Sequence, residues 1–60
     1  MKILIVEDET AAYENLVDIL KWIDPEIVIA GNTESIKQTI RWLKNNPMPD
    51  LILMDIHLSD

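Results

Sequence analysis

Three short apolar runs, separated by two longer stretches of mixed polarity, set the pattern of the chain. The runs are residues 2–6, 27–30 and 51–54, and the last leads directly into Asp55. Apolar runs this short, without polar alternation, are typical of strands buried on both faces, as in parallel sheets. The pattern therefore predicts three buried parallel strands, and Asp55 must lie at the rim of the sheet, where water or an ion can reach a carboxylate.

The first intervening stretch has the periodicity of an amphipathic helix. It runs from about residue 11 to residue 23, and Thr10 is the expected N-cap because its hydroxyl can accept from a free backbone N–H. Asp24-Pro25 should end the helix, since the residue before a proline is pushed out of the helical region. The apolar stripe predicted to face the core consists of Ala12, Leu16, Ile19, Leu20 and Ile23.

The second intervening stretch predicts a turn at Gly31-Asn32 followed by another helix. Ser35 with Gln38 three residues later has the spacing of a capping box, and Thr33 is the competing N-cap. Asn45-Asn46-Pro47 should end this helix. Its inner stripe is predicted to be Ile36, Ile40 and Leu43.

The predicted order of elements is β-α-β-α-β within one domain, residues 1–60. Parallel crossovers are right-handed, and helices on opposite faces of the sheet give the strand order 2-1-3. This is the α/β class, the first half of a flavodoxin-like doubly wound parallel sheet. In such sheets, ligands bind beyond the carboxyl ends of the strands, at the switch point between strands one and three.

Three carboxylates are expected to meet at that switch point. Glu7 and Asp8 follow the first strand, and Asp55 follows the third. Carboxylates so close together repel one another, and a hard divalent cation such as Mg²⁺ would relieve the conflict. A carboxylate beside Mg²⁺ can also attack phosphorus, and Asp55 is the best candidate because it stands alone on its strand.

Composition narrows the classes of function. The net charge of −6, from 11 acidic and 5 basic residues, argues against nucleic-acid binding through a basic patch. The single glycine, Gly31, excludes glycine-rich dinucleotide and phosphate loops, and the absence of cysteine excludes disulfides and thiolate metal sites. With no signal peptide and no long apolar run, no membrane association and a cytoplasmic location are expected.

Two motifs resemble the receiver domain of two-component response regulators, and the resemblance covers all 60 residues. They are Ile5-Val-Glu-Asp-Glu9 and Leu53-Met-Asp-Ile-His-Leu-Ser-Asp60. The chain is most similar to receivers that precede LytTR-type DNA-binding domains, which regulate transcription. The resemblance implies that Asp55 is the phospho-acceptor, Asp8 a direct Mg²⁺ ligand, Glu7 a ligand through water, and His57 a ligand through its backbone carbonyl. It also implies a phosphohistidine on a sensor histidine kinase as the phosphoryl donor.

The sequence also departs from that family. Receivers have five strands and five helices in roughly twice this length, with a Ser/Thr after strand four and a Lys after strand five. No residue among these 60 corresponds to either, so we expect Mg²⁺ binding to survive better than phosphorylation, and switching to be absent. The parent domain would catalyse its own phosphorylation and would not be an enzyme with turnover.

The main alternative is an inert, self-associating flavodoxin-like fragment without phosphotransfer. The third strand would lie at an open edge, and a long apolar edge strand is a template for pairing with another chain. A homo-oligomer formed through this edge is therefore expected. A cobalamin-binding motif is a weaker alternative, because Asp55-x-His57-x-x-Asp60 has Asp where that motif requires Gly.

Overall fold

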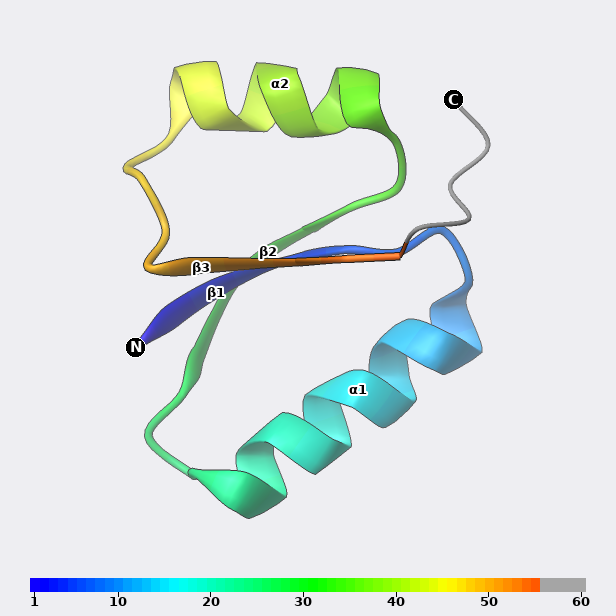
Figure 1. Cartoon of the computed structure of the whole chain (residues 1–60), viewed down its shortest axis with the longest axis vertical. Coiled ribbons are helices and arrows are strands. Elements are labelled where there is room, and N and C mark those ends of the chain that lie inside the picture. Colours follow the sequence, from blue (N-terminus) through cyan, green and yellow to red (C-terminus); the bar gives the residue numbers. More distant parts are fainter. Residues whose placement is uncertain (56–60) are drawn as a thin grey trace.

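The computed structural model describes residues 1–55. Strands and helices alternate along the chain, as predicted (Figure 1). None of the helices in this part of the chain is long and apolar enough to cross a membrane. The elements are β1 (Lys2–Val6), α1 (Thr10–Ile23), β2 (Val28–Thr33), α2 (Ile36–Asn45) and β3 (Leu51–Met54).

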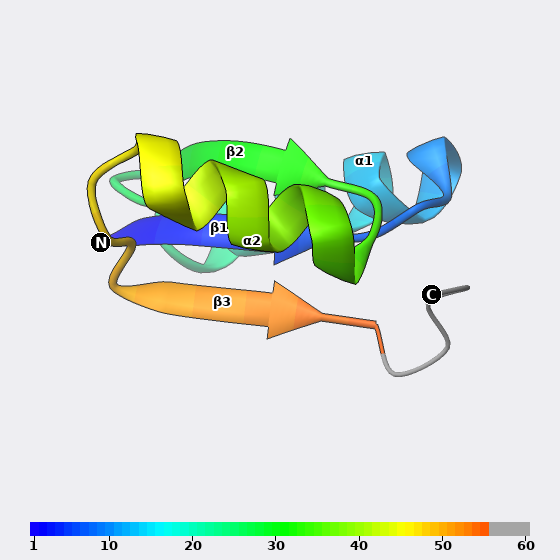
Figure 2. The same cartoon turned by 90° about the horizontal axis from the view of Figure 1, so that it is seen from above.

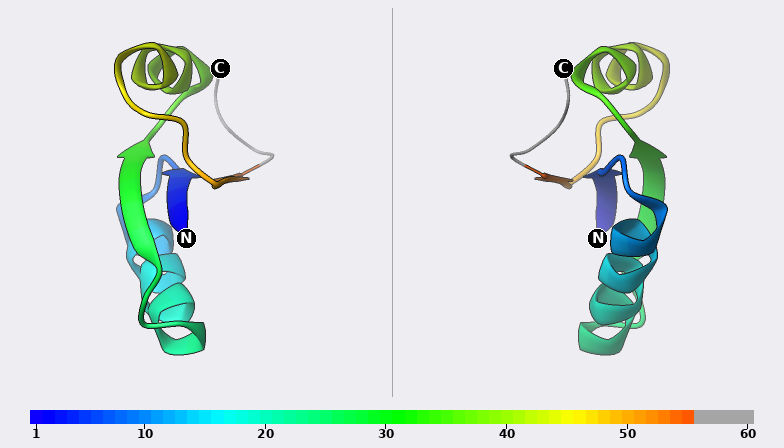
Figure 3. Two further views of the ribbon diagram at one scale, coloured as in Figure 1. Left: turned by 90° about the vertical axis from the view of Figure 1, so that its left-hand side faces the viewer. Right: turned by 90° about the vertical axis from the view of Figure 1, so that its right-hand side faces the viewer.

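The strands form one parallel sheet in the order β2-β1-β3, which confirms the predicted topology (Figure 2). Helix α1 lies on one face of the sheet and α2 on the other, as the two crossovers require (Figures 1 and 3). Strand β1 is consequently the centre of the structure, with a strand on each side and a helix over each face.

Strand β1 supplies most of the core. Ile3, Leu4, Ile5 and Val6 are all at most 1% exposed. On the α1 face, Ile3 and Ile5 form a cluster with the buried Ile27. Partly buried side chains pack against this cluster: Tyr13, Leu16, Val17 and Leu20 of α1, Ile29 of β2 and Leu53 of β3. Since side chains alternate along a strand, Leu4 and Val6 point to the other face, toward α2.

Strand β3 is much less buried than its composition predicts. Leu51 is 43% exposed, Ile52 36% and Met54 48%, and only Leu53 packs against the core cluster. The prediction of burial on both faces is therefore correct for β1 and wrong for β3. The physical reason is position, because β3 is an edge strand that pairs only with β1 among the described residues.

Helix α1 begins and packs differently from the prediction. Its N-cap is Glu9 rather than Thr10, and the Glu9 side chain makes no capping hydrogen bond. The predicted stripe is rotated, because Ile19 is 46% and Ile23 65% exposed while Tyr13 and Val17 face the core. Apolar residues cover more of this helix than one stripe, so periodicity alone could not fix the buried side. The predicted end at Asp24 is confirmed.

Strand β2 extends through Gly31 and Asn32, where a turn was predicted. A register shift lets Ala30 pass without a partner, so that Gly31 pairs with Leu4 and Asn32 with Ile5. The Trp42 ring of α2 packs directly over this point, since a Cβ on Gly31 would lie 2.7 Å from Trp42 Nε1. Glycine is needed here for close approach of the indole ring, not for a turn.

Helix α2 begins as predicted. Ser35 is its N-cap, and the Ser35 hydroxyl accepts from the Gln38 N–H at 3.1 Å. The Gln38 side chain reaches back one residue further than a capping box requires, to the Glu34 N–H. Ile40, predicted to face inward, is 50% exposed, and the buried position is Thr39, which shares a 2.7 Å hydrogen bond with Thr33 of β2.

Candidate functional site

The carboxyl ends of β1 and β3 bring three carboxylates together. The two strands are neighbours with Val6 opposite Met54, so the residues that follow them leave the sheet at the same edge. Glu7, Asp8 and Asp55 each offer a carboxylate oxygen, and these oxygens lie within 4.8 Å of one another. The juxtaposition expected from the strand order is confirmed.

Backbone hydrogen bonds extend the sheet into the site from both sides. The Glu7 N–H donates to the Thr33 carbonyl of β2 at 2.9 Å, and the Asp55 N–H donates to the Val6 carbonyl of β1 at 3.1 Å. Glu7 and Asp55 are half-buried, whereas Asp8 is exposed. The sheet therefore fixes the main chain of Glu7 and Asp55, and Asp8 projects toward solvent from the first turn beyond it.

Glu7 has a structural contact in addition to its place in the cluster. Its Oε2 accepts from the Glu9 N–H at 3.2 Å. Since Glu9 is the N-cap of α1, the Glu7 carboxylate helps to fix the start of that helix. One oxygen is thus engaged with the backbone, and the other remains for an ion or for water in the ion's coordination shell.

A hollow of about 420 Å³ opens at this edge of the sheet. Glu7 and Asp55 supply its charged groups, and apolar side chains form the rest of the wall. Such a wall lowers the local dielectric and strengthens interactions between the carboxylates and a bound cation or phosphoryl group. The residues lining it are Val6, Glu7, Leu16, Leu53, Met54 and Asp55.

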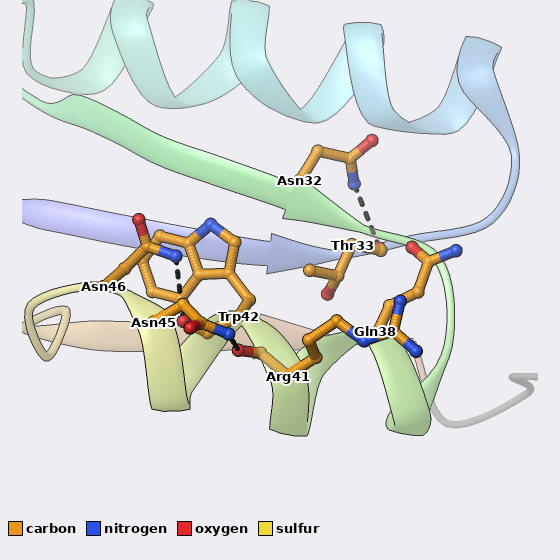
Figure 4. A pocket seen from close by; sticks show the side chains of 7 residues that line it. All are labelled: Asn32, Thr33, Gln38, Arg41, Trp42, Asn45 and Asn46. Atoms are coloured by element: carbon orange, nitrogen blue, oxygen red, sulfur yellow. Dashed lines mark hydrogen bonds between the residues drawn. The ribbon is translucent and has the colours of Figure 1, made fainter.

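A second hollow, of about 340 Å³, lies between β2 and α2 (Figure 4). It contains none of the three carboxylates. Its asparagine amides at the end of α2 are turned back onto the helix, since Asn45 donates to the Arg41 carbonyl and Asn46 to the Trp42 carbonyl. Among the described residues, Glu7 and Asp55 line the hollow at the end of β1 and β3 and not this one.

The three carboxylates fit a hard divalent cation. They supply only oxygen donors, which Mg²⁺ and Ca²⁺ prefer to nitrogen or sulfur. Opposite ligands of Mg²⁺ are about 4.2 Å apart, at two bond lengths of about 2.1 Å. The 4.8 Å spread of the carboxylate oxygens slightly exceeds that separation, so a small side-chain rotation, or a water completing one contact, would let the three residues hold such an ion.

The predicted contribution of the His57 carbonyl lies outside the described residues and stays a prediction. Sequence reasoning missed Asn32 and Thr33, which hold the Glu7 main chain from the end of β2. The sequence signal is the Gly31-Asn32 pair after an apolar run, which predicts a turn. An asparagine side chain can serve equally well as a hydrogen-bond donor to the neighbouring strand.

Comparison with known protein families gave a match that covers nearly the whole chain. A family model described as the response regulator receiver domain matches residues 3–60. Searches of curated proteins and of solved structures gave no significant match. The matched residues include all of β1 except its first residue, the whole of β3 and each of the three carboxylates.

Proposed function

Since the chain belongs to the response regulator receiver domain family, we propose that it accepts a phosphoryl group on Asp55 from a phosphohistidine of a sensor histidine kinase. The family supports a role in two-component signalling. The observation that carries the more specific proposal is the position of Asp55 at the carboxyl end of β3, where a carboxylate oxygen of Asp55 lies within 4.8 Å of those of Glu7 and Asp8. That is the environment in which a carboxylate can act as a nucleophile toward phosphorus.

The proposed ligands of Mg²⁺ are Glu7, Asp8, Asp55 and the backbone carbonyl of His57. Asp8 is the exposed member of the cluster and is free to turn toward the ion, so it is assigned a direct contact. Glu7 already accepts from the Glu9 N–H, so it is assigned a contact through water. When bound, Mg²⁺ would offset the negative charge on the phosphoryl oxygens.

In the proposed reaction, a carboxylate oxygen of Asp55 attacks the phosphorus of the donor. An O–P bond forms as the P–N bond to the donor histidine breaks, and its electron pair returns to the imidazole nitrogen. The hydrogen bond from the Asp55 N–H to the Val6 carbonyl holds the main chain of the nucleophile during this transfer. The chain would promote its own modification without turnover, and the proposed role implies a cytoplasmic location.

Mass spectrometry after incubation with Mg²⁺ and a small phosphoryl donor tests this proposal. The unsubstituted 60-residue chain, called the parent chain below, is expected to gain one phosphoryl group. The Asp55→Asn variant is expected to gain none, because the amide is not a nucleophile. Asp50→Asn is the matched control. Asp50 directly precedes β3, at the end of the strand opposite to Asp55, and its carboxylate accepts from the Lys2 N–H at 2.7 Å. An unmodified parent chain, or equal modification of Asp55→Asn, would contradict the proposal.

A second candidate function is self-association without phosphotransfer. It is favoured by the exposure of Leu51, Ile52 and Met54 on β3, which has only one strand neighbour in the described part of the chain. Strands with unpaired backbone groups and apolar side chains pair with strands of other chains. The proposed assembly is a homo-oligomer in which the β3 strands of two copies pair with each other.

Replacing Ile52 with lysine is expected to reduce such association to a monomer, because a charge on an edge strand opposes strand pairing. Val28→Lys is the matched control, since Val28 is 50% exposed on β2, at the other edge of the sheet. Light scattering over a range of concentrations measures the effect. A parent chain that stays monomeric at every concentration would exclude this candidate, and dissociation by Val28→Lys alone would move the interface to β2.

A further inference from the structure

The side chain of Asn32 binds the main chain that leads into the carboxylate cluster. Its Nδ2 donates to the Ile5 carbonyl at 3.0 Å and to the Glu7 carbonyl at 3.3 Å, both from β1 and the residue after it. A third acceptor, the Thr33 carbonyl, lies 3.2 Å away. Asn32 leaves β2 toward the α1 face, while the neighbouring Thr33 points toward α2 (Figure 4).

Only the N–H end of an amide suits this position. All three neighbouring acceptors are backbone carbonyls, which cannot donate. A carboxylate of the same shape would place lone pairs against lone pairs, and an apolar side chain would leave the carbonyls without this donor. The hydrogen-bond environment therefore favours a side-chain donor of this length.

Asn32 and Thr33 together hold both polar groups of the Glu7 main chain. The Thr33 carbonyl accepts from the Glu7 N–H at 2.9 Å, and the Asn32 amide donates to the Glu7 carbonyl. The Glu7 carbonyl belongs to the planar peptide that joins Glu7 to Asp8. Fixing that carbonyl fixes the plane of this peptide, and with it the position of the Asp8 Cα from which the side chain starts.

The hydrogen bond from Asn32 to the Glu7 carbonyl restrains the main chain at a point where repulsion would otherwise separate the carboxylates. The carboxylates of Glu7, Asp8 and Asp55 carry like charges within 4.8 Å, so their repulsion favours rotation of the exposed Asp8 away from the other two. Asp8 is the residue with the least support of its own, since it follows the last sheet hydrogen bond of this segment. The bond from Asn32 opposes that rotation through the main chain.

We infer that Asn32 is a positioning residue for the cation site, acting through the Glu7–Asp8 peptide and not by contact with the ion. The inference deepens the proposed function and rests on it. Partners of this kind outside the coordination shell typically change metal affinity by about 10- to 100-fold when they are removed. The bond to Glu7 is long at 3.3 Å, so the lower end of that range, about tenfold, is expected.

The test is titration of the 60-residue chain with Mg²⁺ alone. Binding is monitored by NMR, through the amide resonances of the residues around the site. Asn32→Leu removes the donor at similar volume. Asn46→Leu is the matched control, because its Nδ2 also donates to a main-chain carbonyl, that of Trp42 at 2.9 Å. Asn46 lines a hollow with Lys2 and Val28, the first residues of β1 and β2, and therefore lies at the opposite end of the sheet.

Asn32→Leu is expected to weaken Mg²⁺ binding about tenfold, whereas Asn46→Leu should leave it within about twofold, as expected for a distant site. Urea unfolding of both variants separates this effect from a general loss of stability, which would appear in both. If Asn32→Leu does not fold, the smaller Asn32→Ala is titrated in its place, with the same expectation.

The outcomes distinguish this inference from the proposed function. Unchanged Mg²⁺ affinity in a folded Asn32 variant, with normal binding by the parent chain, would overturn the role of Asn32 and leave the proposed site intact. Absence of Mg²⁺ binding by the parent chain itself would overturn the proposed site, and the inference with it. Equal weakening by Asn46→Leu would show that the effect comes from stability and would also overturn the inference.

Discussion

Replacing Asp8 with asparagine is expected to abolish Mg²⁺ binding while leaving the chain folded. Asp8 is exposed and lies two residues beyond Val6, the last residue of β1, so its side chain supports no core contact. Its removal takes away a charged oxygen ligand and reduces the charge of the cluster by one. A cation held by carboxylates depends on that charge, and we expect a loss of more than about 100-fold in affinity, the range beyond that of outer-shell partners.

The same substitution should stabilise the protein when no metal is bound. Without a cation, the carboxylates repel one another, so Asp8→Asn is expected to raise the free energy of unfolding of the metal-free chain. For the parent chain, Mg²⁺ at about 100 times its dissociation constant would add about 2.7 kcal/mol of stability. Added Mg²⁺ should therefore raise the melting temperature of the parent chain and leave that of Asp8→Asn unchanged.

Asp18→Asn is the appropriate control for both measurements. It changes the net charge equally, on an exposed position of α1 outside the cluster. It should retain both Mg²⁺ binding and the Mg²⁺-dependent rise in melting temperature. Equal loss of binding in Asp18→Asn and Asp8→Asn would point to net charge, and not to the carboxylate cluster, as the origin of the affinity.

Replacing Leu4 with alanine is expected to remove a large part of the free energy of unfolding of the protein. Leu4 is 0% exposed on the central strand, and a Leu→Ala change in such a position typically removes about 2–5 kcal/mol. At about 0.05–0.15 kcal/mol per residue, 60 residues have a total stability of roughly 3–9 kcal/mol. The cavity left by Leu4→Ala therefore removes a large part of the free energy of unfolding of the domain, because no other strand is buried as fully as β1.

Leu51→Ala provides the comparison, since Leu51 is 43% exposed on the edge strand. A partly exposed leucine loses less apolar burial on truncation, and we expect a change of about 1 kcal/mol or less. Urea unfolding followed by far-UV circular dichroism measures both variants. Equal destabilisation by Leu4→Ala and Leu51→Ala would contradict the assignment of the core to β1 and would indicate that β3 is covered in solution.

The elements and their order were predictable because local pattern is a reliable signal over short apolar runs and amphipathic stretches. The runs at 2–6 and 51–54 gave strands close to their observed bounds, and the capping pair Ser35 and Gln38 marked the start of α2 correctly. The order 2-1-3 followed from handedness rules that hold for nearly all parallel crossovers. The meeting of Glu7, Asp8 and Asp55 followed in turn from that order.

The failures in predicting burial share one cause, which is that burial depends on neighbours that local pattern does not specify. Ile19 and Ile23 of α1 and Ile40 of α2 are as apolar as residues that pack inward, and yet they are exposed. Gly31 and Asn32 have the composition of a turn, but a register shift in β2 and the Trp42 ring make them part of a strand. Packing overrode local preference at each of these positions.

The sequence by itself determined the element order, the strand that forms the centre of the sheet, and the edge at which the carboxylates gather. These properties depend on periodicity and chain chirality, which act over short distances. Only the tertiary structure decided which apolar side chains are covered and which groups hold the site. The bonds from Asn32 and Thr33 to Glu7 join residues about 25 positions apart, and such contacts exist only once the sheet has formed.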